Sequence, residues 1–324
     1  FIVGFETYKS HQGEIDGKKK QLELKEKYEQ IITQYLGVSA KASELKASWD
    51  FLWPAFELTD LRLTDNQTGK DVLVIPQIKG SLAWASIWHF KPYFHELKIS
   101  NATIDIVRDS NGKWIVAGVP TQGGKGRLID WLLKQDNIEL THTQINLLDQ
   151  KDFSSRSVIA LNSLNIENYW LTHSIETDLT SPWHEGQAHL LANFKHSLIH
   201  SVGNTSHWSG NFSWKINSLD LKIINQFSNA KANIGSGLLS TEGQALLNDG
   251  ILDGGKSQIN LEQLQIQWDH ISEPLRVKSL NATLEESTNG NLMTLSTSSL
   301  KWTTPKIPTE QELKNLEFYW KVAP

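Results

Sequence analysis

From residue 38 onward the chain alternates between apolar and polar positions with a period of two, as in Phe56–Leu58, Leu97–Ile99 and Ile138–Leu140. Successive side chains of a β-strand point to opposite faces, so this period indicates strands with one buried and one polar face. Turn-forming segments separate the strands, among them Asp65–Gly69 and Asp253–Gly255. The sequence therefore predicts a mainly β protein whose short strands form a meandering antiparallel sheet.

The same alternation recurs along the chain, at residues 61–63, 104–106, 145–147, 164–166, 259–261, 264–266 and 275–277. A spacing of 41 residues relates three of the strands, since Phe56, Leu97 and Ile138 start equivalent segments (97 − 56 = 41 and 138 − 97 = 41). A fixed period in this range indicates stacked supersecondary units rather than a closed globule.

Residues 18–36 have a different period, because their apolar side chains recur at three- and four-residue steps among strong helix formers. Gly37 follows, and glycine tolerates the left-handed conformation that ends many helices. The segment is either a lid over one end of the β-structure or an ordinary packing helix, and the second interpretation is the more common one. Shorter helices are predicted at 81–88, 127–134 and 218–227.

Composition narrows the functional classes. The formal net charge of −5 and the pI of about 6.1 argue against nucleic acid as a partner, because phosphate binding needs a concentrated basic surface. The absence of cysteine excludes disulfides, thiolate metal sites and cysteine nucleophiles. No run approaches the ~18 apolar residues that a membrane span requires. Thirteen tryptophans fit either a Trp-rich core or rings at an apolar–polar boundary, and both interpretations stay open.

No motif supports catalysis. The loop Gly118–Gly126 lacks the lysine position and the hydroxyl of a phosphate-binding loop, which makes it a connector. Six histidines gather between His173 and His207, but their spacing on strands does not favour a shared metal ion. The carboxylates lie in polar, turn-like stretches. We therefore expect no enzyme activity, no catalytic residue, no metal and no cofactor.

The stretch from Tyr28 to Val119 resembles the N-terminal region of AsmA-like envelope proteins, and within them the YhdP family. The resemblance is carried by these segments: Tyr28–Ile31, Tyr35–Val38, Trp49, Leu52–Pro54, Leu58–Asp65, Ile78, Leu82, Trp84, Ile87, Leu97–Trp114 and Asp130–Leu133. It is strong to about Leu148 and weaker beyond. Residues 1–26, with the lysines at 18–20, depart from it.

The resemblance implies an elongated, twisted antiparallel sheet that forms an open trough, with a few short helices and the N-terminal helix packed at one end. Residues 1–37 would be a membrane-proximal helical segment, 38–149 an AsmA-like β-repeat region, and 150–324 a continuing β-groove. The apolar residues of the alternating segments would line the groove: Leu97, Ile99, Ile104, Ile106, Ile138, Leu140, Ile145 and Leu147.

The function implied is that of a periplasmic section of a protein that conducts phospholipid between inner and outer membrane. Its partners would be phospholipid acyl chains, the inner membrane through an N-terminal anchor preceding this sequence, and a further partner at the outer membrane. Two alternatives remain: a scaffold that assists outer-membrane protein assembly or envelope integrity, and a closed β-domain with a structural role. Alternation alone cannot separate them, since a trough and a sandwich both have one apolar face.

Overall fold

A computed structural model describes most of the chain, and it divides into two compact units, Phe1–Tyr169 (unit 1) and Trp170–Pro324 (unit 2). The described residues are 22–23, 25–26, 29–30, 33, 39–66, 68–84, 86, 93–120, 132–150, 156–200, 202, 204–227, 232–269, 271–289 and 292–321. Most of these residues lie in strands, and helices are few.

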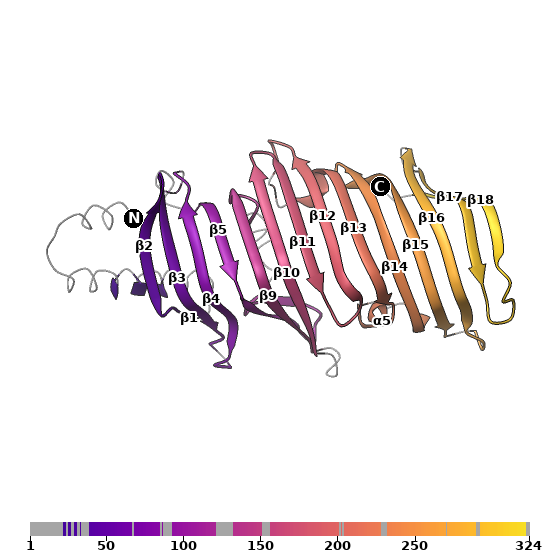
Figure 1. Cartoon of the computed structure of the whole chain (residues 1–324), viewed down its shortest axis with the longest axis horizontal. Coiled ribbons are helices and arrows are strands. Elements are labelled where there is room, and N and C mark those ends of the chain that lie inside the picture. Colours follow the sequence, from indigo (N-terminus) through magenta and orange to yellow (C-terminus); the bar gives the residue numbers. More distant parts are fainter. Residues whose placement is uncertain are drawn as a thin grey trace. The chain divides into compact units, whose positions relative to one another are not determined.

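Unit 1 is built on a β-sheet whose central strands run side by side (Figure 1). Its strands are β1 (Ser39–Lys41), β2 (Glu44–Asp50), β3 (Trp53–Thr64), β4 (Asp71–Leu82), β5 (Phe94–Ser100), β6 (Thr103–Arg108), β7 (Trp114–Val116), β8 (Val119–Pro120), β9 (Asn137–Asp149) and β10 (Arg156–Tyr169). β1 and β2 both pair with β3, and β3 pairs with β4. β5 and β6 follow each other along one line between β4 and β9, and β10 pairs with β9.

Unit 2 is an antiparallel meander in which each strand pairs with the next one along the chain (Figure 1). Its strands are β11 (Thr172–Thr180), β12 (Glu185–His196), β13 (Trp208–Asp220), β14 (Ala232–Asn248), β15 (Ile251–Trp268), β16 (Leu275–Asn289), β17 (Leu292–Thr303) and β18 (Gln311–Lys321). A 3-10 turn, η2 (Thr205–His207), precedes β13, and a short helix, α5 (Ile223–Phe227), lies between β13 and β14.

The mainly β prediction is confirmed, because every alternating segment named above falls within a strand. Among the described strands the pairing is antiparallel, as predicted, except that β9 runs parallel to β5 and β6.

Three local predictions are wrong in whole or in part. The predicted helix 81–88 overlaps β4, which ends at Leu82, and among its described residues only Ser86 is helical. Asp253–Gly255 lies inside β15, where a Cβ on Gly255 would approach the Gln244 carbonyl to 2.8 Å, so glycine here permits close strand pairing and not a turn. The predicted helix 218–227 begins only at Ile223, because β13 continues through Asp220. The predicted helix 127–134 lies largely outside the described residues.

The spacing of 41 residues corresponds to strand register. β5 and β9 pair in parallel with Leu97 opposite Ile138, and Phe56 of β3 reaches Leu97 through Gly80 of β4. Side-chain contacts repeat the interval: the hydroxyls of Ser100 and Thr141 lie 2.9 Å apart, with a sequence separation of 41. The repeat therefore aligns equivalent apolar residues in rows that cross the sheet.

A line of backbone kinks crosses the same sheet. Asp60 in β3, Asn101 between β5 and β6, and His142 in β9 all have positive φ values, of 52°, 58° and 51°, and they are again 41 residues apart. On either side of the line the burial pattern changes phase, since Ile75 and Ile78 are both buried although they are three residues apart. Irregularities of this kind bend strands and increase their twist. The kinks keep one apolar face continuous along strands that would otherwise alternate out of register.

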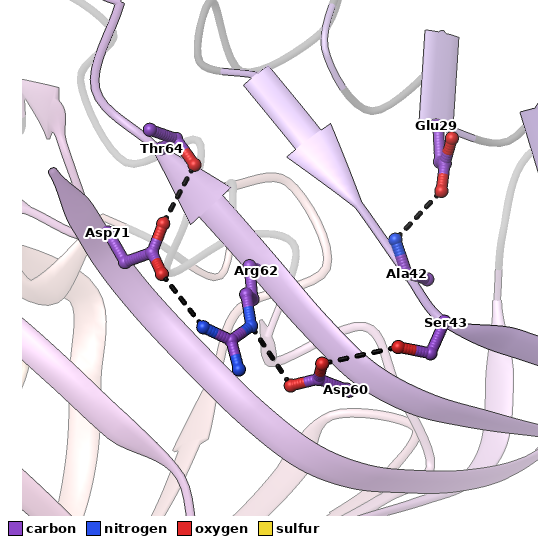
Figure 2. Close-up of polar contacts among 7 residues, drawn as sticks. All are labelled: Glu29, Ala42, Ser43, Asp60, Arg62, Thr64 and Asp71. Carbon is purple, nitrogen blue, oxygen red and sulfur yellow. Dashed lines mark hydrogen bonds and ion pairs between the residues drawn. The ribbon is translucent and has the colours of Figure 1, made fainter. Parts of the chain in front are cut away.

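Side chains of an N-terminal helical segment hydrogen-bond with the edge strand β1. Residues Glu29 and Thr33 are helical, and their side-chain oxygens accept hydrogen bonds from the backbone N–H groups of Ala42 (2.7 Å, Figure 2) and Ala40 (3.0 Å). The Lys25 ammonium donates to the Ala42 carbonyl at 3.0 Å. These bonds occupy backbone groups that an edge strand would otherwise offer to another chain. The rest of the predicted helix 18–36 falls mainly on residues outside the described set.

Candidate functional site

The eight predicted groove residues lie opposite one another on two adjacent parallel strand lines of unit 1. Leu97 and Ile99 of β5 face Ile138 and Leu140 of β9. The second half of the set is paired in the same way, Ile104 with Ile145 and Ile106 with Leu147. We call these eight residues the unit 1 strip.

The strip is not evenly covered. Leu97 and Ile138 are 6% and 1% exposed, whereas the other six residues are half-buried. The closed row continues into β10 with Ile166, which is opposite Ile138 and 5% exposed. Gln135 is fully buried, and its side-chain oxygen accepts a hydrogen bond from the N–H of Phe94 at the start of β5. This bond ties the segment before β9 to the buried end of the strip. One end of the strip is therefore core, and the remainder is a partly open apolar surface.

Polar side-chain pairs lie at both ends of the strip. Arg108 follows Ile106 on the same face of β6, and its Nη1 lies 3.3 Å from Asp149 Oδ2, with both side chains largely buried. At the other end His95 Nδ1 lies 3.0 Å from Asp136 Oδ2, and the imidazole stacks on Trp53 with ring centroids 4.3 Å apart. A charged group removed from water is costly unless it is paired. The buried Arg108–Asp149 ion pair therefore marks one end of the apolar surface, and the more exposed His95–Asp136 contact marks the other end.

The opposite face of unit 1 is polar and carries charge networks. Figure 2 shows Arg62 between two carboxylates, with its Nε donating to Asp60 at 3.1 Å and its Nη1 donating to Asp71 at 3.2 Å. The hydrogen bond to Asp60 and the charge of that carboxylate, followed by the hydrogen bond to Asp71, raise the pKa of the Arg62 guanidinium. Asp71 also accepts a hydrogen bond from Thr64, at 2.9 Å. Exposed pairs of this kind add little stability, but they mark the face that remains in water.

Unit 2 has a longer apolar face, which lies in the region 150–324 predicted as a continuing β-groove, although none of its residues was named as a groove residue. One row crosses strands β13 to β17 and consists of Leu219, Leu239, Leu261, Leu280 and Trp302. The next row consists of Ile216, Thr241, Ile259, Ala282 and Leu300. We call these two rows the unit 2 strip.

The unit 2 strip has little cover among the described residues. Of its ten residues only Ala282 is buried, and the other nine are half-buried. Each described strand of unit 2 packs chiefly against its ladder neighbours, and α5 is the described element that adds a contact with β14. The described strands of this unit belong to one continuous antiparallel ladder, so they form one sheet and not two separate sheets. The alternation of apolar and polar residues at Ile259–Leu261 is the sequence feature that indicates the unit 2 strip.

The reverse face of unit 2 is polar. It carries Glu242, Gln258, Asn260, Asn281 and Lys301, which line a depression of about 470 Å³ together with residues of the unit 2 strip such as Ile259. Ion pairs lie on the same face, for example Lys215 Nζ to Glu242 Oε2 at 3.3 Å. The two faces of this sheet therefore differ sharply in polarity.

The histidines form two pairs rather than one cluster. His173 Nε2 lies 3.0 Å from His196 Nδ1, and His200 stacks on His207 with ring centroids 3.6 Å apart. His189 Nδ1 instead contacts Asp178 Oδ1 at 2.9 Å. Within the described ranges no three His, Asp or Glu side chains are grouped to hold a metal ion.

The burial of His173 predicts a pH-dependent stability. Desolvation, and then the neighbouring charge of His196, lower the pKa of His173 from 6.5 to about 4. Because the folded pKa is lowered, the unfolded chain binds this proton more readily, so the contribution is complete above pH 6.5 and is lost as the pH falls through about 4. The loss should reach ~3 kcal/mol. Urea denaturation from pH 7 to pH 4 should show a steeper decline for wild type than for His173→Phe, and equal slopes would contradict the assignment.

Each unit, as far as it is described, is thus an amphipathic β-sheet, and the described strands of unit 2 form a single layer. These features place the chain in the class of β-sheet proteins with an extended apolar surface. The family profile described as YhdP protein matches residues 22–317, most of the chain, and the chain therefore belongs to the YhdP family. No curated protein and no solved structure gives a significant match. Among the described residues, no helix is both long and apolar enough to cross a bilayer.

Proposed function

We propose that this chain is a non-catalytic section of an envelope protein that conducts phospholipid, with the acyl chains lying on the apolar faces of its sheets. The observation that carries the proposal is the row from Leu219 to Trp302, which continues across neighbouring strands while its side chains stay half-buried. Soluble monomers rarely leave contiguous apolar surfaces of this extent open to water. Membership of the YhdP family is consistent with a role in lipid transport in the envelope.

In this proposal the kinks at Asp60, Asn101 and His142 curve the unit 1 sheet toward a trough, and the N-terminal helix covers its edge at β1. The polar faces, with the Arg62 network and the Lys215–Glu242 pair, remain in water. The protein would act in the periplasm, tethered to the inner membrane, and would pass lipid toward the outer membrane. No cofactor is needed, because the lipid moves without a bond being made or broken.

Native mass spectrometry of the purified chain, followed by lipid extraction, tests the proposal. Wild type should carry phospholipid, and Ile104→Asp or Ile145→Asp should lose at least nine-tenths of it, because a charge would then lie against acyl chains. Thr103→Asp is the matched control, since Thr103 precedes Ile104 in β6 and points to the other face. Retention of lipid by folded Ile104→Asp, or a lipid-free wild type, would overturn the conduit and favour a structural or scaffolding role.

A further inference from the structure

We propose that one end of the unit 1 sheet is a membrane-docking tip that inserts aromatic and aliphatic side chains into the headgroup region of a lipid bilayer. The tip consists of Trp49, Phe51 and Leu52 at the β2–β3 turn and Trp84 after β4. These four residues are 54%, 90%, 60% and 43% exposed.

Strand direction places these residues at the same end of the sheet. β3 begins at this end, and β4 returns to it, since Ala55 pairs with Ser81. Ring contacts connect the two turns, because Trp53 lies 6.2 Å from Trp84 between ring centroids and stacks on His95 at the start of β5. The tip is therefore one surface, and paired strands hold it in place.

The same end continues toward β10. His95 contacts Asp136, and the Asp136 carbonyl accepts a hydrogen bond from the Asn168 backbone N–H at 2.8 Å. The next residue, Tyr169, is 83% exposed. From β3 to β10 this line crosses four strand spacings, which is roughly 19 Å. Amphipathic rings thus follow the edge formed by the strand ends.

Phe51 combines a strained backbone conformation with a highly exposed side chain. Phe51 has a φ of 51°, a conformation in which glycine or asparagine is usual and a bulky residue is rare. Phe51 is also 90% exposed, so its ring contributes little to the packing of this fold. A contact between the Phe51 ring and a partner outside the chain would explain why a large apolar residue occupies this unfavourable conformation.

A bilayer fits this surface better than a protein does. With side chains that offer ~150–250 Å² each, the exposed part of the four residues is on the order of 500 Å². A stable protein interface takes roughly 800 Å² from each partner, arranged as a compact patch. The tip is instead a narrow line of turns, and such a line can insert into a planar, fluid bilayer without a complementary binding surface. Tryptophan and tyrosine are the residues enriched at the boundary between lipid and water.

The test is flotation of the chain with phosphatidylcholine vesicles. Wild type should bind, and binding should change little between low and high salt because the tip side chains are uncharged. Phe51→Asn combined with Leu52→Ser should weaken binding at least tenfold. Asparagine tolerates positive φ, so the turn itself is retained and circular dichroism should be unchanged. Val158→Ser is the matched control, since Val158 is an exposed apolar residue (46%) near the start of β10, at the opposite end of unit 1.

Several results would overturn the tip. Wild type that does not float, or a double variant that floats like wild type, would do so. So would a wild type that is dimeric by light scattering and becomes monomeric in the double variant, because the surface would then join two copies. The inference stands apart from the lipid conduit: Ile104→Asp should still float, whereas the tip variant should still carry lipid once loaded.

Discussion

Aspartate in place of Ile138 is expected to unfold unit 1. Ile138 is 1% exposed, and its ladder neighbours Leu97 and Ile166 are 6% and 5% exposed. An unpaired carboxylate at this position loses its water without gaining a partner, which costs at least ~4 kcal/mol. Domains of this size are stable by only about 5–15 kcal/mol. Urea denaturation followed by circular dichroism should show most of the stability of unit 1 lost, and limited proteolysis should cut within β3 to β10.

The control is Ile138→Val, which removes one methylene from the same site and should cost about 1 kcal/mol. A difference between the two variants of several kcal/mol would establish that Ile138 belongs to the core. If Ile138→Asp instead unfolds at nearly the urea concentration of the valine variant, water reaches this position. The closed end of the strip would then be part of the open surface.

The strands and much of their register could be predicted from the sequence, because both depend on local alternation. The interval of 41 residues between Leu97 and Ile138 is visible in the sequence, and the structure shows that it pairs these residues across β5 and β9. The kinks could not be predicted in the same way. Asp60, Asn101 and His142 belong to the residue types that, after glycine, most often have positive φ values, but the same types also occupy ordinary polar positions of turns and strands, so residue type alone does not locate a kink.

The candidate site was predictable only in part. Alternation selects Leu97 and Ile104 equally, yet burial separates them, since Leu97 is 6% exposed and Ile104 is half-buried. That difference depends on connecting segments such as the one around Gln135, whose contacts are long-range. In unit 2 the positive φ of Gln263, at 52°, shifts the alternation between Leu261 and Leu264. A count that assumes strict alternation therefore assigns Leu261 and Leu264 to opposite faces, whereas the kink at Gln263 allows the apolar face to continue past it.

The proposed lipid conduit predicts that the unit 2 strip carries lipid as well as the unit 1 strip. Leu261 lies in the middle of the strip, between Leu239 and Leu280 on the neighbouring strands, and it is half-buried. Leu261→Asp should therefore fold, because the new carboxylate can reach water when no lipid is present. With acyl chains on the strip the same carboxylate would be desolvated at a cost of about 3 kcal/mol, which corresponds to a loss of bound phospholipid of ~100-fold.

Asn260→Asp is the control that shows whether the face on which the charge lies matters, or only the added charge itself. Asn260 precedes Leu261 in β15, pairs with Ser240 and Asn281, and is exposed, so the substitution adds the same charge on the opposite face. Lipid extraction should find wild-type phospholipid in Asn260→Asp and almost none in Leu261→Asp. If Leu261→Asp retains its lipid while Ile104→Asp loses it, the acyl chains lie on unit 1 alone. Loss in both variants means that each strip is required, as expected of a path that lipid must follow along the whole chain.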